Sequence, residues 1–257
     1  MTTQPRKKPR QMLIVGTMLL AMAAIIGVLF SRTASIPNSD SSGSNSDPVN
    51  FHTRMSYSLS PGPGDGVTGS GDMKSETRKL APYSAIESDG AVDIKWSPGP
   101  APSAVVNAQA TILPHIKTEV VDGTLKISTD SITTTGAMTV TLTGPQINRV
   151  DLSGAGDFSA SALAGDNIEV KASGSSDLHF DGNVHHFTIE IDGSGDVAAG
   201  DLKTGSTDIT ITGSGDAQVN ATDSLSADIS GSGDVTYRGK PLQVAQNISG
   251  SGTVESK

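Results

Sequence analysis

The chain lacks cysteine and is poor in aromatic residues. None of its 257 residues is cysteine, and aromatic residues make up 4% of it. The absence of cysteine excludes disulfide bonds, thiolate metal sites, a cysteine nucleophile and the lipidated cysteine of a lipoprotein, and it assigns no compartment. The scarcity of aromatics is typical of a thin solenoid, whose interior holds mainly small and β-branched side chains.

Motifs of common catalytic and nucleotide-binding sites are missing as well. The sequence contains no Gly-x-Ser-x-Gly elbow, no P-loop and no His-Glu-x-x-His pair. Gly-x-Gly recurs, but no helix is predicted after it, so it is not the fingerprint of a dinucleotide site. The sequence therefore predicts no catalytic residue, no bound cofactor and a protein that is not an enzyme.

Charge is divided unevenly along the chain. The first 32 residues contain 5 of the 18 basic residues and no acidic one, so the remainder carries 13 − 27 = −14. Such an acidic surface does not bind the phosphates of nucleic acid or an anionic lipid surface. It suits solubility, divalent cations and neutral or basic partners.

The most informative feature that is present is a five-residue phrase that occurs six times in the second half of the chain. The copies occupy 153–157, 173–177, 192–196, 212–216, 230–234 and 249–253, with starts 20, 19, 20, 18 and 19 residues apart. Their common form is Ser-Gly-Ser-Gly-Asp. A fixed period in this range predicts a solenoid, in which each repeat buries its apolar face against its neighbours.

The residues around each copy fall into apolar columns. One column precedes the phrase, a second follows it, and polar residues alternate with them, which predicts two short, half-buried strands per repeat. The preceding column is Leu152, Ala172, Ile191, Ile211, Ile229 and Ile248, and the following one is Phe158, Leu178, Val197, Ala217, Val235 and Val254. A looser column at a third corner holds Leu163, Val184, Leu202 and Leu225.

Two strands and their corners in about 19 residues make one coil of a parallel β-helix, so the predicted fold class is all-β. Helical coils are disfavoured because Gly, Ser, Thr and Asp dominate and no 3.6-residue stripe is present. A hairpin sandwich would not place the same residue in the same column in every repeat. The paired glycines permit the positive φ that a sharp turn between strands needs.

The middle of the chain lacks the phrase but retains strand patterns. Strands are predicted at 84–87, 91–96, 104–108, 116–121, 124–128, 138–142 and 147–152. Asp122-Gly123 predicts a tight turn, and residues 112–116 a single helical turn. We expect this region to form the first, less regular coils of the same β-helix and its N-terminal cap, so that 67–257 is one domain.

The N-terminus has the pattern of a membrane anchor. Arg6, Lys7, Lys8 and Arg10 precede an apolar run over residues 12–30. Nineteen residues approach the roughly 20 that span a bilayer as a helix, and the preceding charges place residues 1–11 in the cytoplasm. The alternative is a cleaved secretory signal, whose apolar region is usually shorter. The segment 31–66, rich in Ser, Asn, Pro and Gly, is predicted to be a flexible, disordered linker.

The Asp that ends five of the copies is the candidate site. Stacked coils would align Asp157, Asp177, Asp196, Asp216 and Asp234 in a ladder about 4.8 Å apart. The carboxylates would either cap the turns by accepting backbone N–H groups or bind a hard cation such as calcium. The calcium-binding nonapeptide has a different spacing, so these residues are weak metal candidates and turn capping is the favoured interpretation.

A second polar cluster contains three histidines. His179, Asp181, His185 and His186 lie close in sequence, and two imidazoles with a carboxylate are able to hold zinc. However, His185 and His186 are neighbours on a predicted strand or corner and point to opposite sides. The favoured interpretation is a solvated polar turn.

The repeated phrase and the segment leading into it resemble a bacterial family, the auto-transporter adhesin head GIN domains, over about residues 67–257. The leading segment comprises 67–72, 76–78, 83–87, 113–119 and 122–127. The resemblance implies a right-handed parallel β-helix in an exported protein. Two copies depart from the phrase, with Ser176 in place of glycine and Thr253 in place of Asp. A charge is therefore not needed in every coil.

Three functions are consistent with these patterns. The first is a non-catalytic β-helix, tethered to the bacterial inner membrane through residues 12–30, whose domain lies in the periplasm or outside and binds a glycan or an envelope protein or serves as a scaffold. The second is a module that forms homo-oligomers by end stacking, because the last coil has no evident cap. The third is a carbohydrate-active enzyme, against which near-identical carboxylates argue, since an acid and a base need different environments.

Overall fold

The computed structural model describes residues 66–257, which are almost entirely β-structure. The strands form a 15-stranded sheet wound around a common interior and a two-stranded ladder of β1 (Val67–Thr68) and β8 (Ile132–Thr133). The predicted helical turn is confirmed as η1 (Leu113–His115), a 3-10 helix. The described range contains no helix with the length and hydropathy that crossing a bilayer requires. The predictions for 1–11, 12–30 and nearly all of 31–66 lie outside it.

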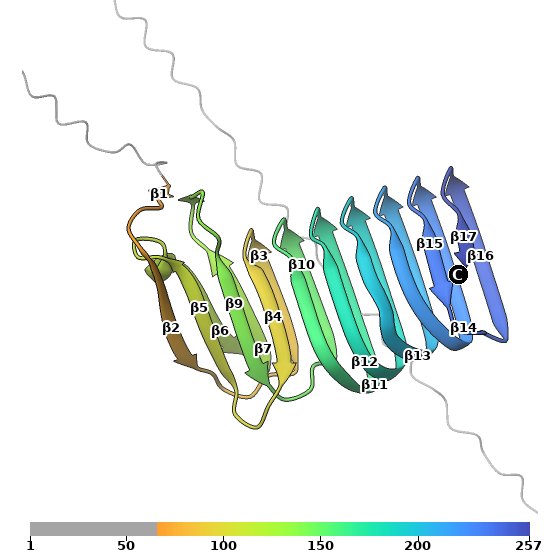
Figure 1. Ribbon diagram of the computed structural model, residues 1–257, viewed down its shortest axis with the longest axis horizontal. Helices are drawn as coiled ribbons and strands as arrows, with labels where there is room; N and C mark the ends of the chain where they lie inside the picture. Colours follow the sequence, from red (N-terminus) through yellow and green to blue (C-terminus); the bar gives the residue numbers. More distant parts are fainter. Residues whose placement is uncertain (1–65) are drawn as a thin grey trace, which may run out of the picture. The chain divides into compact units, whose positions relative to one another are not determined.

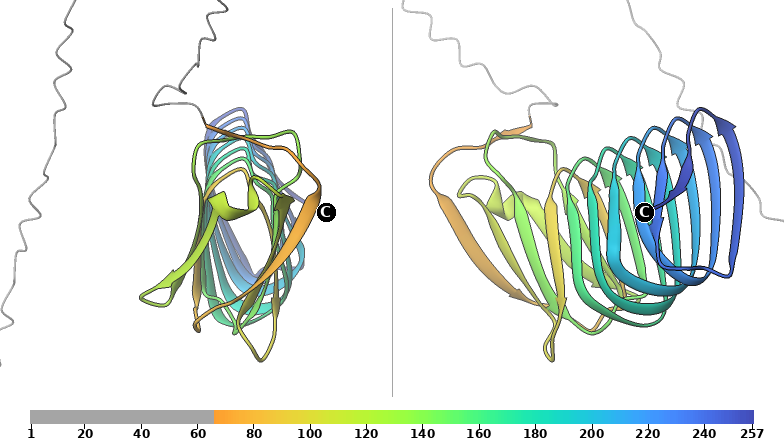
Figure 2. Two further views of the ribbon diagram at one scale, coloured as in Figure 1. Left: turned by 90° about the vertical axis from the view of Figure 1, so that its left-hand side faces the viewer. Right: turned by 45° about the vertical axis from the view of Figure 1, so that its right-hand side comes forward.

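Residues 149–257 form what we call the regular coils. Each long strand bends midway, so that its two parts lie in opposite walls of a flattened tube (Figure 2). All of these strands pair in parallel with the equivalent strands of adjacent coils, which confirms a parallel β-solenoid (Figure 1). The strands are β10 (Arg149–Gly154), β11 (Phe158–Gly174), β12 (Leu178–Gly193), β13 (Val197–Gly213), β14 (Ala217–Gly231), β15 (Val235–Arg238), β16 (Gln243–Gly250) and β17 (Val254–Ser256).

The two apolar columns that flank the phrase coincide with the observed register. Leu152 aligns through successive coils down to Ile248, and Phe158 down to Val254, without a break. Except in the last coil, these side chains are buried. Three phenylalanines pack within this core, with ring centroids 5.7 Å apart for Phe158 and Phe180 and 5.6 Å apart for Phe180 and Phe187.

The prediction that four residues align in one column at the third corner is wrong. Leu163 and Leu202 share a row with Gly182, whereas Val184 and Leu225 lie in two other rows. All four predicted residues are nevertheless buried. The coils differ in length by one or two residues, and register shifts at this bend absorb the difference. Counting residues from the glycine turn therefore no longer identifies equivalent positions at this bend.

Glycine is required at the turn between the walls. The first glycine of the phrase has a positive φ in every copy, for example 136° at Gly213. A Cβ at Gly213 would collide with the carbonyl oxygen of Gly193 in the preceding coil. The same oxygen accepts a hydrogen bond from the Ser214 N–H at 2.9 Å. The second glycine position has no positive φ, and one copy carries Ser176 there. In the next copy, a Cβ at Gly195 would still collide with the carbonyl oxygen of Ser176, so close stacking favours glycine at this position too.

Residues 66–148 form a second part of the domain, which we call the N-terminal cap. Its remaining strands are β2 (Met73–Lys79), β3 (Ala85–Gly90), β4 (Asp93–Pro98), β5 (Ser103–Gln109), β6 (Ile116–Val121), β7 (Thr124–Thr129) and β9 (Thr139–Gly144). All seven predicted strands are confirmed, as β3–β7, β9 and β10. The sequence pattern did not predict β1, β2 or β8, none of whose residues is fully buried.

The order of the first coils in space differs from their order in sequence. β3 and β4 pair in parallel with β10 and the start of β11. β7 and β9 come later in the sequence but lie on the other side of β3 and β4, also in parallel. The expected less regular first coils therefore do not follow one another in sequence order, because the chain folds outward after β4 and returns to start β10 (Figure 1).

Antiparallel strands lie at the outer end of the cap. β2 pairs antiparallel with β5, β5 with β9, and β6 with β7. The predicted turn at Asp122-Gly123 joins β6 to β7, with φ values of 49° and 76°. The half-buried Arg78 ties β2 to η1 and β6, since its guanidinium donates to the carbonyl oxygens of Ile116 at 2.6 Å and Leu113 at 3.2 Å.

Candidate functional site

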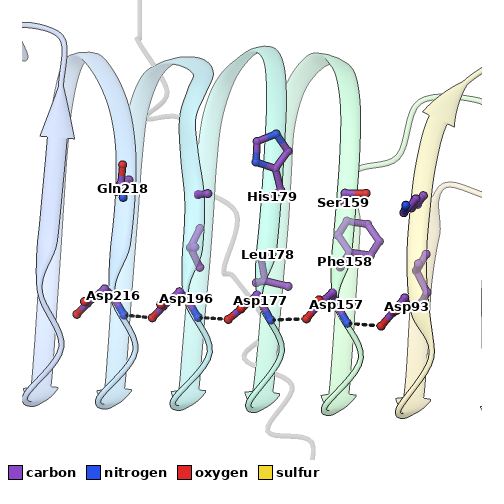
Figure 3. Close-up of a pocket in the computed structure, with 14 residues that line it drawn as sticks. Asp93, Asp157, Phe158, Ser159, Asp177, Leu178, His179, Asp196, Asp216 and Gln218 are labelled. Atoms are coloured by element: carbon purple, nitrogen blue, oxygen red, sulfur yellow. Dashed lines mark hydrogen bonds between the residues drawn. The ribbon is translucent and has the colours of Figure 1, made fainter. Parts of the chain in front are cut away.

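The five predicted Asp residues form one continuous column along an edge of the solenoid. In each coil the Asp backbone N–H donates to Oδ1 of the Asp in the preceding coil (Figure 3). The N···O distances are 3.3 Å for Asp177 to Asp157, 3.1 Å for Asp196 to Asp177, 2.9 Å for Asp216 to Asp196 and 2.8 Å for Asp234 to Asp216. These carboxylates therefore cap the turns of neighbouring coils.

The column extends one coil beyond the predicted residues at its start. The Asp157 N–H donates to Oδ1 of Asp93 at 3.2 Å. Gly90 aligns with Gly154, so residues 89–93 are a divergent copy of the phrase. This copy keeps only the first glycine and the final Asp, and the spacing of those two residues was the signal that could have identified it. At the other end, the N–H and hydroxyl of Thr253 both donate to Asp234 Oδ1 at 2.8 Å.

A groove of about 600 Å³ runs across the coils beside the Asp column (Figure 3). It crosses β4, β11, β12, β13 and β14, each of which contributes the Asp at or just before its start and the residues that follow. Its outward-facing side chains occupy successive register positions on adjacent strands, in the order Lys95, Ser159, His179, Ala198 and Gln218. Because Ala198 has a short side chain, it leaves space between His179 and Gln218.

Negative charge dominates this groove. Five carboxylates line it, from Asp93 to Asp216, against one lysine, Lys95, and one histidine, His179. Within residues 66–257 the Oδ1 atoms of these aspartates are occupied by backbone N–H groups, whereas their Oδ2 atoms take no hydrogen bond. The free oxygens are therefore available to accept hydrogen bonds from hydroxyl or ammonium groups of a ligand.

The opposite wall also carries charges, but these are paired at its N-terminal end. Lys126 pairs with Glu87 at 3.0 Å, and Lys171 with Glu190 at 3.1 Å. The hydrogen bond and charge of Glu190 raise the pKa of Lys171. Because these charged groups already have partners, the N-terminal end of this wall offers a ligand fewer free acceptors than the groove does.

The structure separates the members of the histidine cluster. His179 lies in the groove, while Asp181 accepts a backbone N–H of the preceding coil at 2.7 Å. His185 pairs with Asp166 at 3.0 Å, and His186 is exposed. In the part of the chain that the structure describes, no group of three or more His, Asp or Glu side chains is arranged to hold a metal ion. Cation binding by the Asp column stays a prediction.

Comparisons with known proteins agree with this architecture. The family model described as "Putative auto-transporter adhesin, head GIN domain" matches residues 82–241. A solved structure described as a "putative adhesin" from Bacteroides fragilis is 23% identical with a TM-score of 0.62, and one from Parabacteroides distasonis is 25% identical with a TM-score of 0.51. Each alignment covers 75% of this chain and 100% of the other.

A third solved structure, described as a "putative lipid binding protein" from Parabacteroides distasonis, is 20% identical with a TM-score of 0.51 over 75% of this chain and 100% of its own. A comparison with curated proteins gave no match. The family model spans more than half of the chain and includes five of the six glycine turns, most of the Asp column and the groove. This chain therefore belongs to the auto-transporter adhesin head GIN domain family.

Proposed function

We propose that this chain is an exported, non-catalytic, right-handed β-solenoid that acts in adhesion at the bacterial cell envelope by binding an extended polymer along the groove. The groove carries the proposal, because it crosses five strands in five adjacent coils with an Asp carboxylate at each step. A surface that repeats every 4.8 Å or so suits a linear ligand better than a compact one. Membership of an adhesin family supports an adhesion-like role.

The charges of the groove favour a neutral polymer rich in hydroxyl groups, such as a glycan. The free Oδ2 atoms of Asp157, Asp177 and Asp196 would accept hydrogen bonds from hydroxyl groups. Phosphorylated or sulfated polymers would be repelled by the five carboxylates, whose charge the single Lys95 does not balance. A basic segment of an envelope protein is the other ligand that this charge permits.

The uniformity of the Asp column supports a binding role over a catalytic one. Each carboxylate accepts the same backbone N–H from the next coil. A glycoside hydrolase needs two carboxylates in different environments, so that one is protonated while the other is ionised. Nothing in the groove distinguishes one Asp from the next in this way.

Binding is tested with a variant that fills the groove without disturbing the Asp column. Ala198→Trp places a large side chain between His179 and Gln218. We expect the full chain to bind glycans on an array and the variant to lose at least about tenfold in affinity, with an unchanged melting temperature. Thr188→Trp, on the opposite wall, is the matched control and should bind as the wild type does. Equal binding by Ala198→Trp and wild type would exclude the groove.

We infer further that residues 12–30 anchor the protein in the inner membrane with the domain outside the cytoplasm. The basic residues before this segment support that orientation. Alkaline extraction of membranes is the test, since a spanning helix stays in the pellet. Release of the protein into the supernatant, with a new N-terminus after residue 30, would instead show a cleaved signal.

A further inference from the structure

β16 is an uncharged strand at the edge of the sheet. It pairs with β14 on one side and with no other strand in residues 66–257, so a row of backbone N–H and C=O groups faces outward. None of its eight residues is charged or proline. The edge strands at the opposite end carry charges, with Lys74 and Glu76 in β2 and Lys117 and Glu119 in β6. Such charges prevent edge-to-edge pairing, and β16 lacks them.

The interior face of β16 is also uncovered. Val244 and Ile248 are 42% and 36% exposed. They align with Leu225 and Ile229, which are 1% and 0% exposed in the preceding coil. The residues of each pair occupy the same row and differ only in whether another strand covers them. This end of the solenoid therefore presents apolar side chains beside a free backbone edge.

The Asp column ends here in an uncharged residue. Thr253 takes the place of Asp in the last copy, and its N–H and hydroxyl both bind Asp234. Along the Asp column, a second molecule that meets this end therefore does not bring two Asp carboxylates of the outermost rungs together. Three features favour contact with an equally uncharged surface. β16 has no charged residue, its core residues are exposed, and the Asp column ends in a neutral residue.

We propose that β16 pairs antiparallel with β16 of a second copy of this chain, about a twofold axis at Gln246. Val244 of one copy then lies opposite Ile248 of the other, and the two Gln246 residues lie opposite each other. Residues opposite one another in an antiparallel pair share a face, so these apolar pairs extend the core across the axis. The two Gln246 amides are able to donate to and accept from each other.

This pairing closes on itself and gives a dimer. Head-to-tail stacking would instead place β16 against the charged strands β2 or β6 and would continue as a filament. On the other wall, β17 carries Glu255, and pairing there would oppose two like charges. The pairing is therefore confined to the β16 wall.

The absence of cysteine permits a direct test in the full chain. Gln246→Cys places one thiol from each copy at the axis, where Cα atoms of an antiparallel pair lie about 4.5–5.5 Å apart, within disulfide range. We expect mild oxidation to give a covalent dimer in at least about tenfold greater yield than Thr188→Cys, an exposed position in an inner coil of the same wall. Equal cross-linking of the two variants would overturn the proposal.

A second variant tests the same contact without oxidation. Gln246→Lys opposes two positive charges at the axis, so we expect the dimer dissociation constant of the detergent-solubilised full chain to rise about tenfold or more in sedimentation equilibrium. Thr188→Lys and the groove variant Ala198→Trp should leave the dimer intact, which separates this contact from polymer binding.

Three results would contradict the dimer. They are a monomeric wild type at high micromolar concentration, assemblies larger than a dimer that survive Gln246→Lys, and a monomer whose β16 amides are protected from hydrogen exchange. The last would show that another segment of the same chain covers β16.

Discussion

The regular coils and the N-terminal cap turn the chain between two stacked walls in different ways. In the regular coils, a glycine with positive φ makes the turn, and the Asp that ends the turn donates its backbone N–H to the Asp carboxylate of the preceding coil. In the cap, single side chains make the contacts that hold the chain in place. Arg78 donates a hydrogen bond to the carbonyl oxygen of Leu113, and the Thr134 hydroxyl donates one to Gln109 Oε1 at 2.7 Å. Stability at a regular turn therefore depends on the next coil, whereas in the cap it depends on single residues.

The two regions also differ in whether the polar groups buried in their cores have hydrogen-bond partners. In the regular coils, the buried Thr204 and Thr207 hydroxyls hydrogen-bond each other at 2.6 Å. In the cap, the Tyr83 hydroxyl and Trp96 Nε1 are buried without a well-formed hydrogen bond in the described residues. Burial raises the pKa of Tyr83 to about 12, and the neighbouring Trp96 only partly opposes this. In the regular coils, Asp151 Oδ1 is also buried without a hydrogen bond in the described residues, so the contrast applies only to these core side chains.

The largest expected effect comes from adding a methyl group at a regular turn. Gly213→Ala combines a φ of 136° with a collision against Gly193 of the preceding coil. We expect it to lower the free energy of unfolding by roughly 3 kcal/mol, measured by urea denaturation. Gly123→Ala in the cap, where φ is 76° and no atom lies within 4 Å, should cost about 1 kcal/mol. Equal losses in the free energy of unfolding for the two variants would show that the close contact with the preceding coil does not add to the cost at a regular turn.

A cap-specific effect of intermediate size is expected at Arg78. Arg78→Ala leaves the carbonyl groups of Leu113 and Ile116 without this donor and should cost about 2 kcal/mol. Arg78→Lys keeps the charge but loses the forked geometry, so it should recover only part of the loss. In hydrogen exchange, the amides of β2 and β6 should lose protection while those of β12 and β13 do not. Uniform loss would mean that the two regions unfold as one unit.

The Asp column should respond weakly to loss of a single charge. Asp196→Ala removes the acceptor of the Asp216 N–H and is expected to cost about 1 kcal/mol. Asp196→Asn keeps an acceptor oxygen and should cost less than about 0.5 kcal/mol. Thermal melting of both variants compares them. A large cost for Asp196→Asn would show that the charge itself is needed, for example to bind a cation.

The smallest expected effect is a pH dependence in the cap. Hydrogen bonds from Lys117 and His115 lower the pKa of Asp130, so its stabilising effect is present above the unfolded pKa near about 4. That effect is lost as the pH falls through the lower pKa of the folded state. In urea denaturation, Asp130→Asn should have a slightly lower midpoint than the wild type at pH 6, and the difference should vanish near about pH 2. A difference that grows on acidification would contradict this assignment.

The regular coils were predicted more completely than the cap because each of their contacts is repeated. Columns such as Ile191, Ile211 and Ile229 report the same position several times, so a single substitution does not hide the pattern. The cap has one copy of each contact, and Asp93 was missed because its copy of the phrase keeps only two residues. The groove was missed as well, because Ser159, Ala198 and Gln218 share no chemical type and are neighbours only across strands.

The sequence by itself determined the parallel solenoid, its period, its two main core columns and the position of the Asp column. It did so because a glycine with positive φ and an alternating strand are local requirements, visible in each repeat. Only the tertiary structure decided the order of the first coils, the alignment at the third corner, the groove and the exposed strip on β16. These depend on which segments lie side by side and on where bulges absorb differences in length, and neither is encoded in the spacing of any one repeat.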